Sequence, residues 1–254
     1  MDATSFIFSE YLFDSRRRSS GTASNPVFTF AAPTTVTTIQ VIELEIPVSW
    51  YVINSGNNKL DFNDGAARTA TITPGNYTRS SLAPEIKAAM EAVSALTFTV
   101  TIDRNSLIVT IAATGPFSIL LVTGPNAPTG TGMSIEKVIG FARADTGSAV
   151  SHSGSSPINL AGENYIFVTS PIITGTSIIT PVGNSDLTNA LGRLQVVSPP
   201  SSIMQQNRPG KEVYIGKENV ATIEFGLRFQ DNTDVDLNGL DWSILVRLSQ
   251  YGNF

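Results

Sequence analysis

Polar and apolar residues alternate with a period of two along much of the chain. The clearest run covers residues 35–46, where β-branched and aliphatic residues alternate with polar ones until Pro47 ends the run. This alternation is typical of a strand with one buried and one solvated face. Other ranges rich in β-branched or aromatic residues predict further strands at 50–54, 60–62, 69–73, 98–102, 107–111, 117–122, 164–169, 177–180, 193–197, 211–215, 221–229 and 242–248. The pattern therefore predicts a mainly β protein.

One segment, at about residues 80–93, has helical periodicity instead. Leu82, Ile86, Met90 and Val93 lie on one face of this segment, and Ser80 or Ser81 can cap its N-terminus. Because short strands surround it, residues 59–132 are expected to form a small α/β unit with the helix packed on a sheet. Residues 134–141 predict a short helical turn, and residues 144–157 a polar loop.

The remaining strands predict the main domain. Residues 35–58 and 133–254 together supply about the eight strands that one antiparallel jelly-roll β-sandwich needs, with residues 59–132 as an insertion. Two side-by-side domains would give a similar pattern. Residues 1–34 mix aromatic residues with a Ser/Gly/Thr-rich stretch, and we expect them to form an extended N-terminal arm. The large apolar groups of such an arm need a covering surface, either the body of the protein or a neighbouring subunit.

Composition narrows the classes of function. The formal net charge of −5 argues against direct binding of nucleic acid, because neutralising phosphates needs an excess of Lys and Arg. The chain has no cysteine, so disulfides and Cys-ligated zinc are excluded. No apolar run approaches the roughly 20 residues of a membrane-spanning helix. Residues 1–13 contain two acidic residues and no basic cluster, so they are not expected to be a signal peptide.

No pattern indicates a catalytic centre. His152 is the single histidine, and its polar surroundings predict an exposed loop residue rather than part of a catalytic pair. Glu43 and Glu45 share one strand face just before a proline and are expected to lie on a solvated edge. We therefore predict no catalytic residues, no cofactor and no enzymatic activity.

The acidic segment 231–239 is the one candidate for a metal site. Asp234, Asp236, Asn238 and Gly239 match the first half of a calcium-binding loop, but Leu245 stands where that loop needs its bidentate acid. The segment is therefore predicted to be an acidic turn between two strands, and no metal ligand is assigned.

Several stretches, in order along the chain, resemble the minor capsid and penton proteins of nucleocytoplasmic large DNA viruses, virophages and related transposon-viruses. They are DSRRR at 14–18 with NPVFTF at 25–30, VIELEIPVSWYVI at 41–53, ITPGNYT at 72–78, IGF at 139–141 with NYI at 164–166, and IEFGLRF at 223–229 with DLNGLDWSI at 236–244. Each motif is weak alone, whereas the set spans nearly the whole chain. The chain departs from the group at Arg17, where an acidic residue often separates the arginines.

The resemblance implies a structural virion protein, located in an icosahedral capsid that assembles in the host cytoplasm. Its expected partners are the major capsid protein, other minor capsid proteins and further copies of the chain, as a pentamer if it occupies the vertex. The expected anchors on the arm are aromatic, because buried aromatic residues usually carry interface energy. They are Phe6, Phe8, Tyr11 and Phe13, followed by the basic run Arg16, Arg17 and Arg18.

Two other classes remain open. A receptor- or glycan-binding spike or fibre module shares the β-rich, Ser/Thr-rich composition, but it needs an exposed aromatic platform. Trp50 and Trp242 lie beside or within strand patterns, where burial is expected. A hydrolase on a β-sandwich would need acids converging in a pocket.

Overall fold

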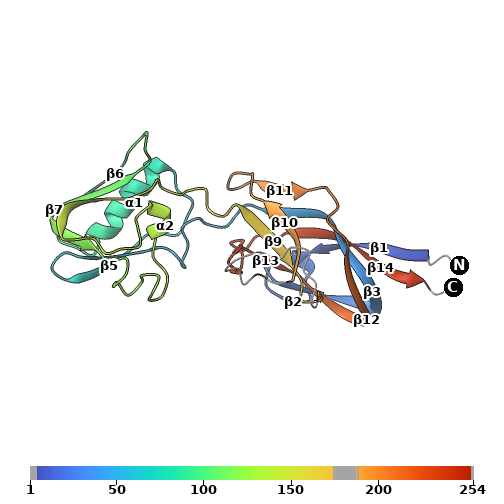
Figure 1. The fold of residues 1–254 in the computed structure, drawn as a ribbon. Helices are drawn as coiled ribbons and strands as arrows, with labels where there is room; N and C mark the ends of the chain where they lie inside the picture. The colour runs from blue at the N-terminus through green and yellow to red at the C-terminus, as the bar shows by residue number, and fades with distance from the viewer. Residues whose placement is uncertain (1–4, 174–186, 188, 253–254) are drawn as a thin grey trace. The chain divides into compact units, whose positions relative to one another are not determined.

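The computed structural model describes residues 5–173, 187 and 189–252. It divides the chain into unit 1, which comprises Met1–Trp50 with Glu163–Phe254, and unit 2, which comprises Tyr51–Gly162 (Figure 1). All pairs of named strands are antiparallel, and the protein is mainly β as the sequence predicts.

Unit 1 is a jelly-roll-like β-sandwich. Its elements are β1 (Ser5–Asp14), the 3-10 helix η1 (Ser15–Arg17), β2 (Ser20–Gly21), β3 (Pro26–Pro47), β9 (Tyr165–Thr169), β10 (Ala190–Gln195), β11 (Ile203–Gln206), β12 (Val213–Glu224), β13 (Gly226–Arg228) and β14 (Ser243–Gly252). A six-stranded sheet has the order β1-β14-β3-β11, with β12 and β2 also paired to β3, and a three-stranded sheet has the order β10-β9-β13. Buried side chains of both sheets, among them Leu44, Val246 and Val168, form one hydrophobic core.

The first 34 residues differ from the expected extended arm. Residues 5–14 form β1, which pairs with β14 from Ser5↔Gly252 to Asp14↔Ser243. β3 begins at Pro26 rather than at residue 35, because residues 27–29 pair with β12. The physical reason is that pairing with β14 and β12 satisfies the backbone groups of this segment and lets part of its apolar side chains be buried.

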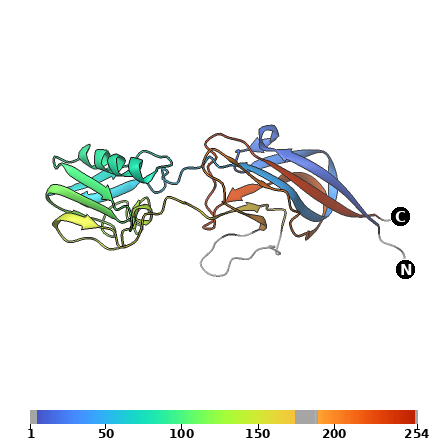
Figure 2. The ribbon, with the colours of Figure 1, turned by 90° about the horizontal axis from the view of Figure 1, so that it is seen from above.

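Unit 2 contains one sheet and two helices. Its elements are β4 (Lys59–Asn63), β5 (Ala67–Thr71), α1 (Arg79–Glu91), β6 (Phe98–Ile102), β7 (Val109–Ile119), α2 (Glu136–Ile139) and β8 (Ala149–Ser153). The strand order is β5-β4-β7-β6, with β8 also paired to β7. Helix α1 lies along one face of this sheet (Figure 2) and buries Leu82, Ile86 and Met90, the face that the sequence predicts. Its cap is Thr78 rather than Ser80 or Ser81, because the Thr78 side chain accepts a hydrogen bond from the Ser81 backbone N–H.

The bounds of this unit also differ from the expected 59–132. The structure assigns it residues 51–162. The predicted strand at 50–54 is reduced to a bridge between Ile53 and Gly75, and the predicted polar loop at 144–157 contains strand β8. The predicted strand at 177–180 lies outside the described residues.

Glu136 is a buried carboxyl group in unit 2, and its Oε2 atom has no hydrogen-bond partner among the described residues. Burial raises the pKa of Glu136 above its ordinary value of 4.5, against the opposing effect of Arg143 and Lys137. The folded state therefore binds this proton more tightly than the unfolded state does. The resulting stabilisation is complete below about pH 4.5 and is lost as the pH rises through the raised pKa.

Replacing Glu136 by Gln is therefore expected to stabilise unit 2 at neutral pH, with a benefit that shrinks as the solution is acidified. Hydrogen exchange of the β4 and β7 amides reports the stability of this unit. The exposed Glu43→Gln variant in unit 1 is the control and should leave these amides unchanged. A Glu136→Gln variant that exchanges faster than the wild type at neutral pH would contradict the prediction.

Candidate interaction surface

The pairing of β1 with β14 decides where each predicted arm anchor points. Phe13 is opposite Ile244 and Tyr11 is opposite Val246, on the face turned towards the core. Successive side chains of a strand point to opposite faces. Phe8 and Leu12 therefore lie on the face turned away from the core, where they are 59% and 69% exposed.

Phe13 and Tyr11 pack within their own unit. The Phe13 ring lies 5.0 Å from the ring of Phe28 and 5.2 Å from the ring of Phe225, measured between centroids. Tyr11 contacts Phe30 edge to face at 5.5 Å. Phe13 is only 7% exposed. The backbone of Phe6 pairs with Tyr251, and the side chain of Phe6 lies outside the described residues.

The single acid between Phe8 and Leu12 is neutralised across the strand pair. Arg247 of β14 donates to Glu10, with 2.6 Å between Nη2 and Oε1. The same guanidinium lies 4.7 Å from the centroid of the Phe8 ring, within the range of a cation–π contact. This part of the outward face is therefore apolar and close to neutral.

The three consecutive arginines have three different environments. Arg16 forms an ion pair with Asp14 at 2.6 Å, and this hydrogen-bonded contact holds the pKa of Asp14 below its ordinary value. Arg18 donates to the backbone oxygen of Ser15 at 2.7 Å and contacts Asp241 at 3.4 Å. Arg17 is exposed and has no hydrogen bond or ion pair with the described residues. The run is thus divided between structural contacts and one solvated cation.

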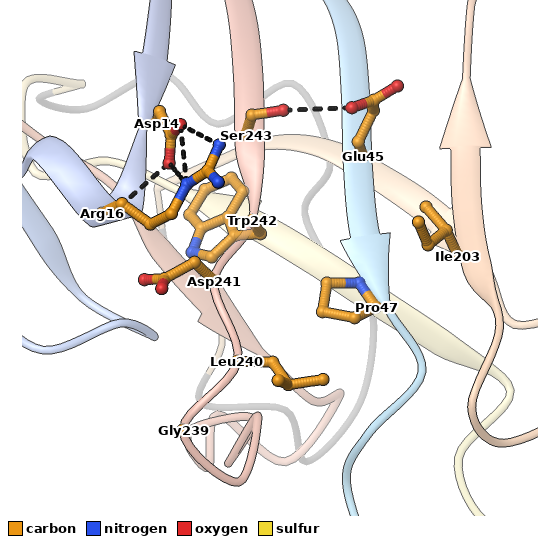
Figure 3. Close-up of a pocket in the computed structure, with 10 residues that line it drawn as sticks. All are labelled: Asp14, Arg16, Glu45, Pro47, Ile203, Gly239, Leu240, Asp241, Trp242 and Ser243. Carbon is orange, nitrogen blue, oxygen red and sulfur yellow. Dashed lines mark hydrogen bonds and ion pairs between the residues drawn. The ribbon is translucent and has the colours of Figure 1, made fainter.

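A shallow hollow of about 380 Å³ lies beside the end of β1 (Figure 3). It is lined by Asp14, Arg16, Glu45, Pro47, Ile203, Gly239, Leu240, Asp241, Trp242 and Ser243. Its acids already have partners: Glu45 accepts from Gln205 at 2.8 Å, and Asp241 accepts from Ser15 at 2.7 Å. Ile203 and Leu240 flank the hollow and are 63% and 50% exposed. We call the exposed side chains of Ile203, Leu240, Phe8 and Leu12 the outward surface.

Three of these four outward residues were not predicted as contact residues from the sequence. Leu12 belongs to the predicted arm but was not expected as an anchor, because the anchors were chosen as aromatic and basic residues. Ile203 lies in β11, a strand that the sequence pattern did not predict. Leu240 follows the acidic turn and carries no recognisable signal of its own.

His152 corrects another expectation, that of an exposed loop residue. It lies in β8, is buried, and its Nε2 is 2.8 Å from the backbone oxygen of Phe117. Its ring also packs edge to face on the Phe117 ring, with 4.6 Å between centroids. Sequence could not show this, because His152 is the one buried residue of β8 and its burial follows from the pairing of β8 with β7.

The acidic side chains of segment 231–239 form hydrogen bonds or ion pairs with different nearby residues and do not converge on one point. Asp231 accepts from Thr233, Asp234 pairs with Arg228, and Asp236 accepts from the Asn238 backbone at 2.8 Å. Throughout the part of the chain that the structure describes, no three His, Asp or Glu side chains gather as metal ligands would. None of the described helices is both long and apolar enough to cross a bilayer.

The model of a family of unknown function, DUF5901, matches residues 8–217 of the chain. The chain belongs to the DUF5901 family. The matched part of this DUF5901 protein begins in β1, includes the whole of unit 2 and ends in β12. It therefore contains Phe8, Leu12 and Ile203.

Among solved structures, the chain is similar to the crystal structure of the selenomethionine-labelled mavirus penton protein. The two are 10% identical in sequence, and the TM-score is 0.49. The alignment covers 98% of this DUF5901 chain and 100% of the mavirus chain. A search of curated proteins gave no match.

The different burial of Phe13 and Phe8 can be tested by measuring how much each contributes to the free energy of unfolding. Phe13→Ala should lower the free energy of unfolding of unit 1 by about 3–5 kcal/mol, because it leaves a cavity in the core. Phe8→Ala should cost at most about 1 kcal/mol, since it removes an exposed ring and one cation–π contact. Both tryptophans, Trp50 and Trp242, lie in unit 1, so denaturant unfolding followed by tryptophan fluorescence reports this unit. Equal costs for the two variants would show that β1 is not packed as described.

Proposed function

We propose that this chain is a structural virion protein, a minor capsid or penton protein that joins an icosahedral capsid through contacts of its outward surface with neighbouring capsid proteins. The observation that carries the proposal is that four large apolar side chains are exposed to solvent on β1, on β11 and in the turn before β14. They are Phe8, Leu12, Ile203 and Leu240. Large exposed apolar surfaces usually mark sites of protein association.

The architecture suits such a role. Pairing within two antiparallel sheets satisfies most backbone groups of unit 1, so its surface can be devoted to contacts. The order of sequence motifs described above resembles capsid proteins along nearly the whole chain. The partners we propose are the major capsid protein, other minor capsid proteins and further copies of this chain, in a virion assembled in the host cytoplasm.

The predicted arm anchors are proposed to have two different roles, because some are exposed and others lie in or against the core. Phe8 and Arg17 remain candidates for contacts with neighbours, because Phe8 is largely exposed and Arg17 has no ion pair with the described residues. Tyr11 and Phe13 act instead through the core, which positions β1. If five copies surround a vertex, ring closure needs two different patches on each copy, and the outward surface would be one of them.

A glycan-binding spike module gains no specific support. Trp50 and Trp242 are buried rather than displayed as a stacking platform. The Trp242 indole N–H donates to the backbone oxygen of Ala23 at 2.6 Å, and the Trp50 ring packs against Phe229.

Charge introduced on the outward surface tests the proposal. A tagged chain carrying Ile203→Lys and Leu240→Lys should fold but fail to enter virions assembled in cells, because two cations would have to be desolvated at the contact. Quantitative mass spectrometry of purified particles measures incorporation, and cryo-electron microscopy locates the wild-type chain.

The matched control carries Val150→Lys and Val197→Lys, at positions that are 56% and 76% exposed but lie outside the outward surface. It should incorporate as the wild type does. Absence of the wild-type chain from purified particles, or full incorporation of the Ile203/Leu240 variant, would refute the proposal.

A further inference from the structure

The two edges of the six-stranded sheet differ in how well they are protected from pairing with another strand. β12 pairs with β3 through three register shifts and carries charged residues such as Lys217 and Glu218, and β11 has only four residues. Bulges, charges and short length are the usual means by which proteins protect an exposed edge. β1, at the other edge, is ten residues long, contains no proline and pairs with β14 without a register shift.

The backbone of β1 has a free side. In an antiparallel sheet, the N–H and C=O groups of alternate residues point to opposite neighbours. β14 takes one set of these groups, and no described strand pairs with the other set. Such an edge is complementary to the backbone of another extended strand, because the same spacing of donors and acceptors recurs in every strand.

The side chains of β1 define what kind of strand would fit. Its outward row presents the exposed Phe8 and Leu12, and on the inward row Ile7 is exposed while Tyr11 is partly buried. The charges of the strand are already compensated: Arg247 neutralises Glu10 and Arg16 neutralises Asp14. An added strand would therefore meet apolar groups and no uncompensated charge, which favours an uncharged segment with alternating large apolar residues.

A second copy of β1 fits this edge poorly. When a two-fold axis joins two copies edge to edge, the outward faces of both sheets lie on the same side. Outward residues of one β1 can therefore only be opposite outward residues of the other, and these are the even-numbered ones. Antiparallel pairing about the middle of the strand then sets Glu10 opposite Glu10 or sets Glu10 opposite Phe8. Each Glu10 already has its own Arg247, so the first arrangement sets two acids opposite each other and the second sets an acid opposite an apolar ring, and neither adds a favourable cross-strand pair.

We infer that the outer edge of β1 is a strand-addition site that takes an extended, uncharged segment with alternating apolar residues from a different protein. The inference deepens the proposed function and rests on it only for the origin of that protein, another component of the capsid. Main-chain hydrogen bonds supply affinity at such a site, and contacts with Phe8 and Leu12 supply selectivity.

A synthetic peptide tests the site on the full chain in isolation. The probe has the sequence of residues 243–252 with threonine in place of the arginine and with neutral ends, Ser-Ile-Leu-Val-Thr-Leu-Ser-Gln-Tyr-Gly, since this strand already pairs with β1 in the structure. Fluorescence anisotropy measures its binding. Hydrogen exchange should show protection of alternate β1 amides, those that point away from β14, while the amides bonded to β14 stay unchanged.

Two variants of the probe separate strand addition from general stickiness. Each variant is N-methylated at alternate residues, which removes the N–H donors along one edge of the strand. The two variants differ in which edge is blocked. One of the two peptides should lose binding at least about tenfold and the other should retain it, because only one set faces β1. Equal binding by both peptides would overturn the inference.

Protein variants complete the test. Leu12→Lys should weaken probe binding at least about tenfold, whereas Val197→Lys should not change it. Tryptophan fluorescence unfolding checks that both variants are folded. Binding without protection in β1, absence of binding, or a concentration-dependent dimer protected along β1 would each overturn the inference. Intact probe binding by a chain that never enters particles would instead contradict the capsid role alone.

Discussion

The antiparallel pairing of β1 with β14 is the contact on which the rest of unit 1 depends. It joins residues 5–14 to residues 243–252 in one unbroken register, so the two ends of the sequence lie side by side in one sheet. Because side chains alternate along a strand, this register also assigns every residue of β1 to the core or to solvent. A shift by one residue would bury Phe8 and Leu12 and would expose Phe13.

The same register explains why the charged residues of β1 leave its surface with little net charge. Arg247 stands opposite Glu10 because their strands pair, and Asp14 holds Arg16 where β1 passes into η1. Exposed ion pairs of this kind contribute little to stability. Their consequence here is electrostatic, because they leave Phe8 and Leu12 in a nearly neutral surrounding.

The predicted interaction residues illustrate how far a linear pattern can be taken. The aromatic content of residues 6–13 predicts that these side chains need a covering surface, but content alone does not say which surface covers which side chain. Phe13 is covered by Phe28 and Phe225, and Tyr11 is covered by Phe30. Each of these partners comes from a strand other than β1 or from a segment that joins strands, so the local sequence does not reveal it. His152 shows the same limit, since its burial follows from the pairing of β8 with β7 across some forty intervening residues.

The sequence by itself determined the local features of this protein. Alternation predicted most strands, the spacing of Leu82, Ile86 and Met90 predicted the face of α1, and composition predicted a mainly β chain. Only the tertiary structure decided which apolar residues become core and which become surface. The physical reason is that periodicity depends on neighbours along the chain, whereas burial depends on strands that meet from opposite ends of it. The outward surface and the open edge of β1 are products of that meeting, and no local pattern of residues encodes them.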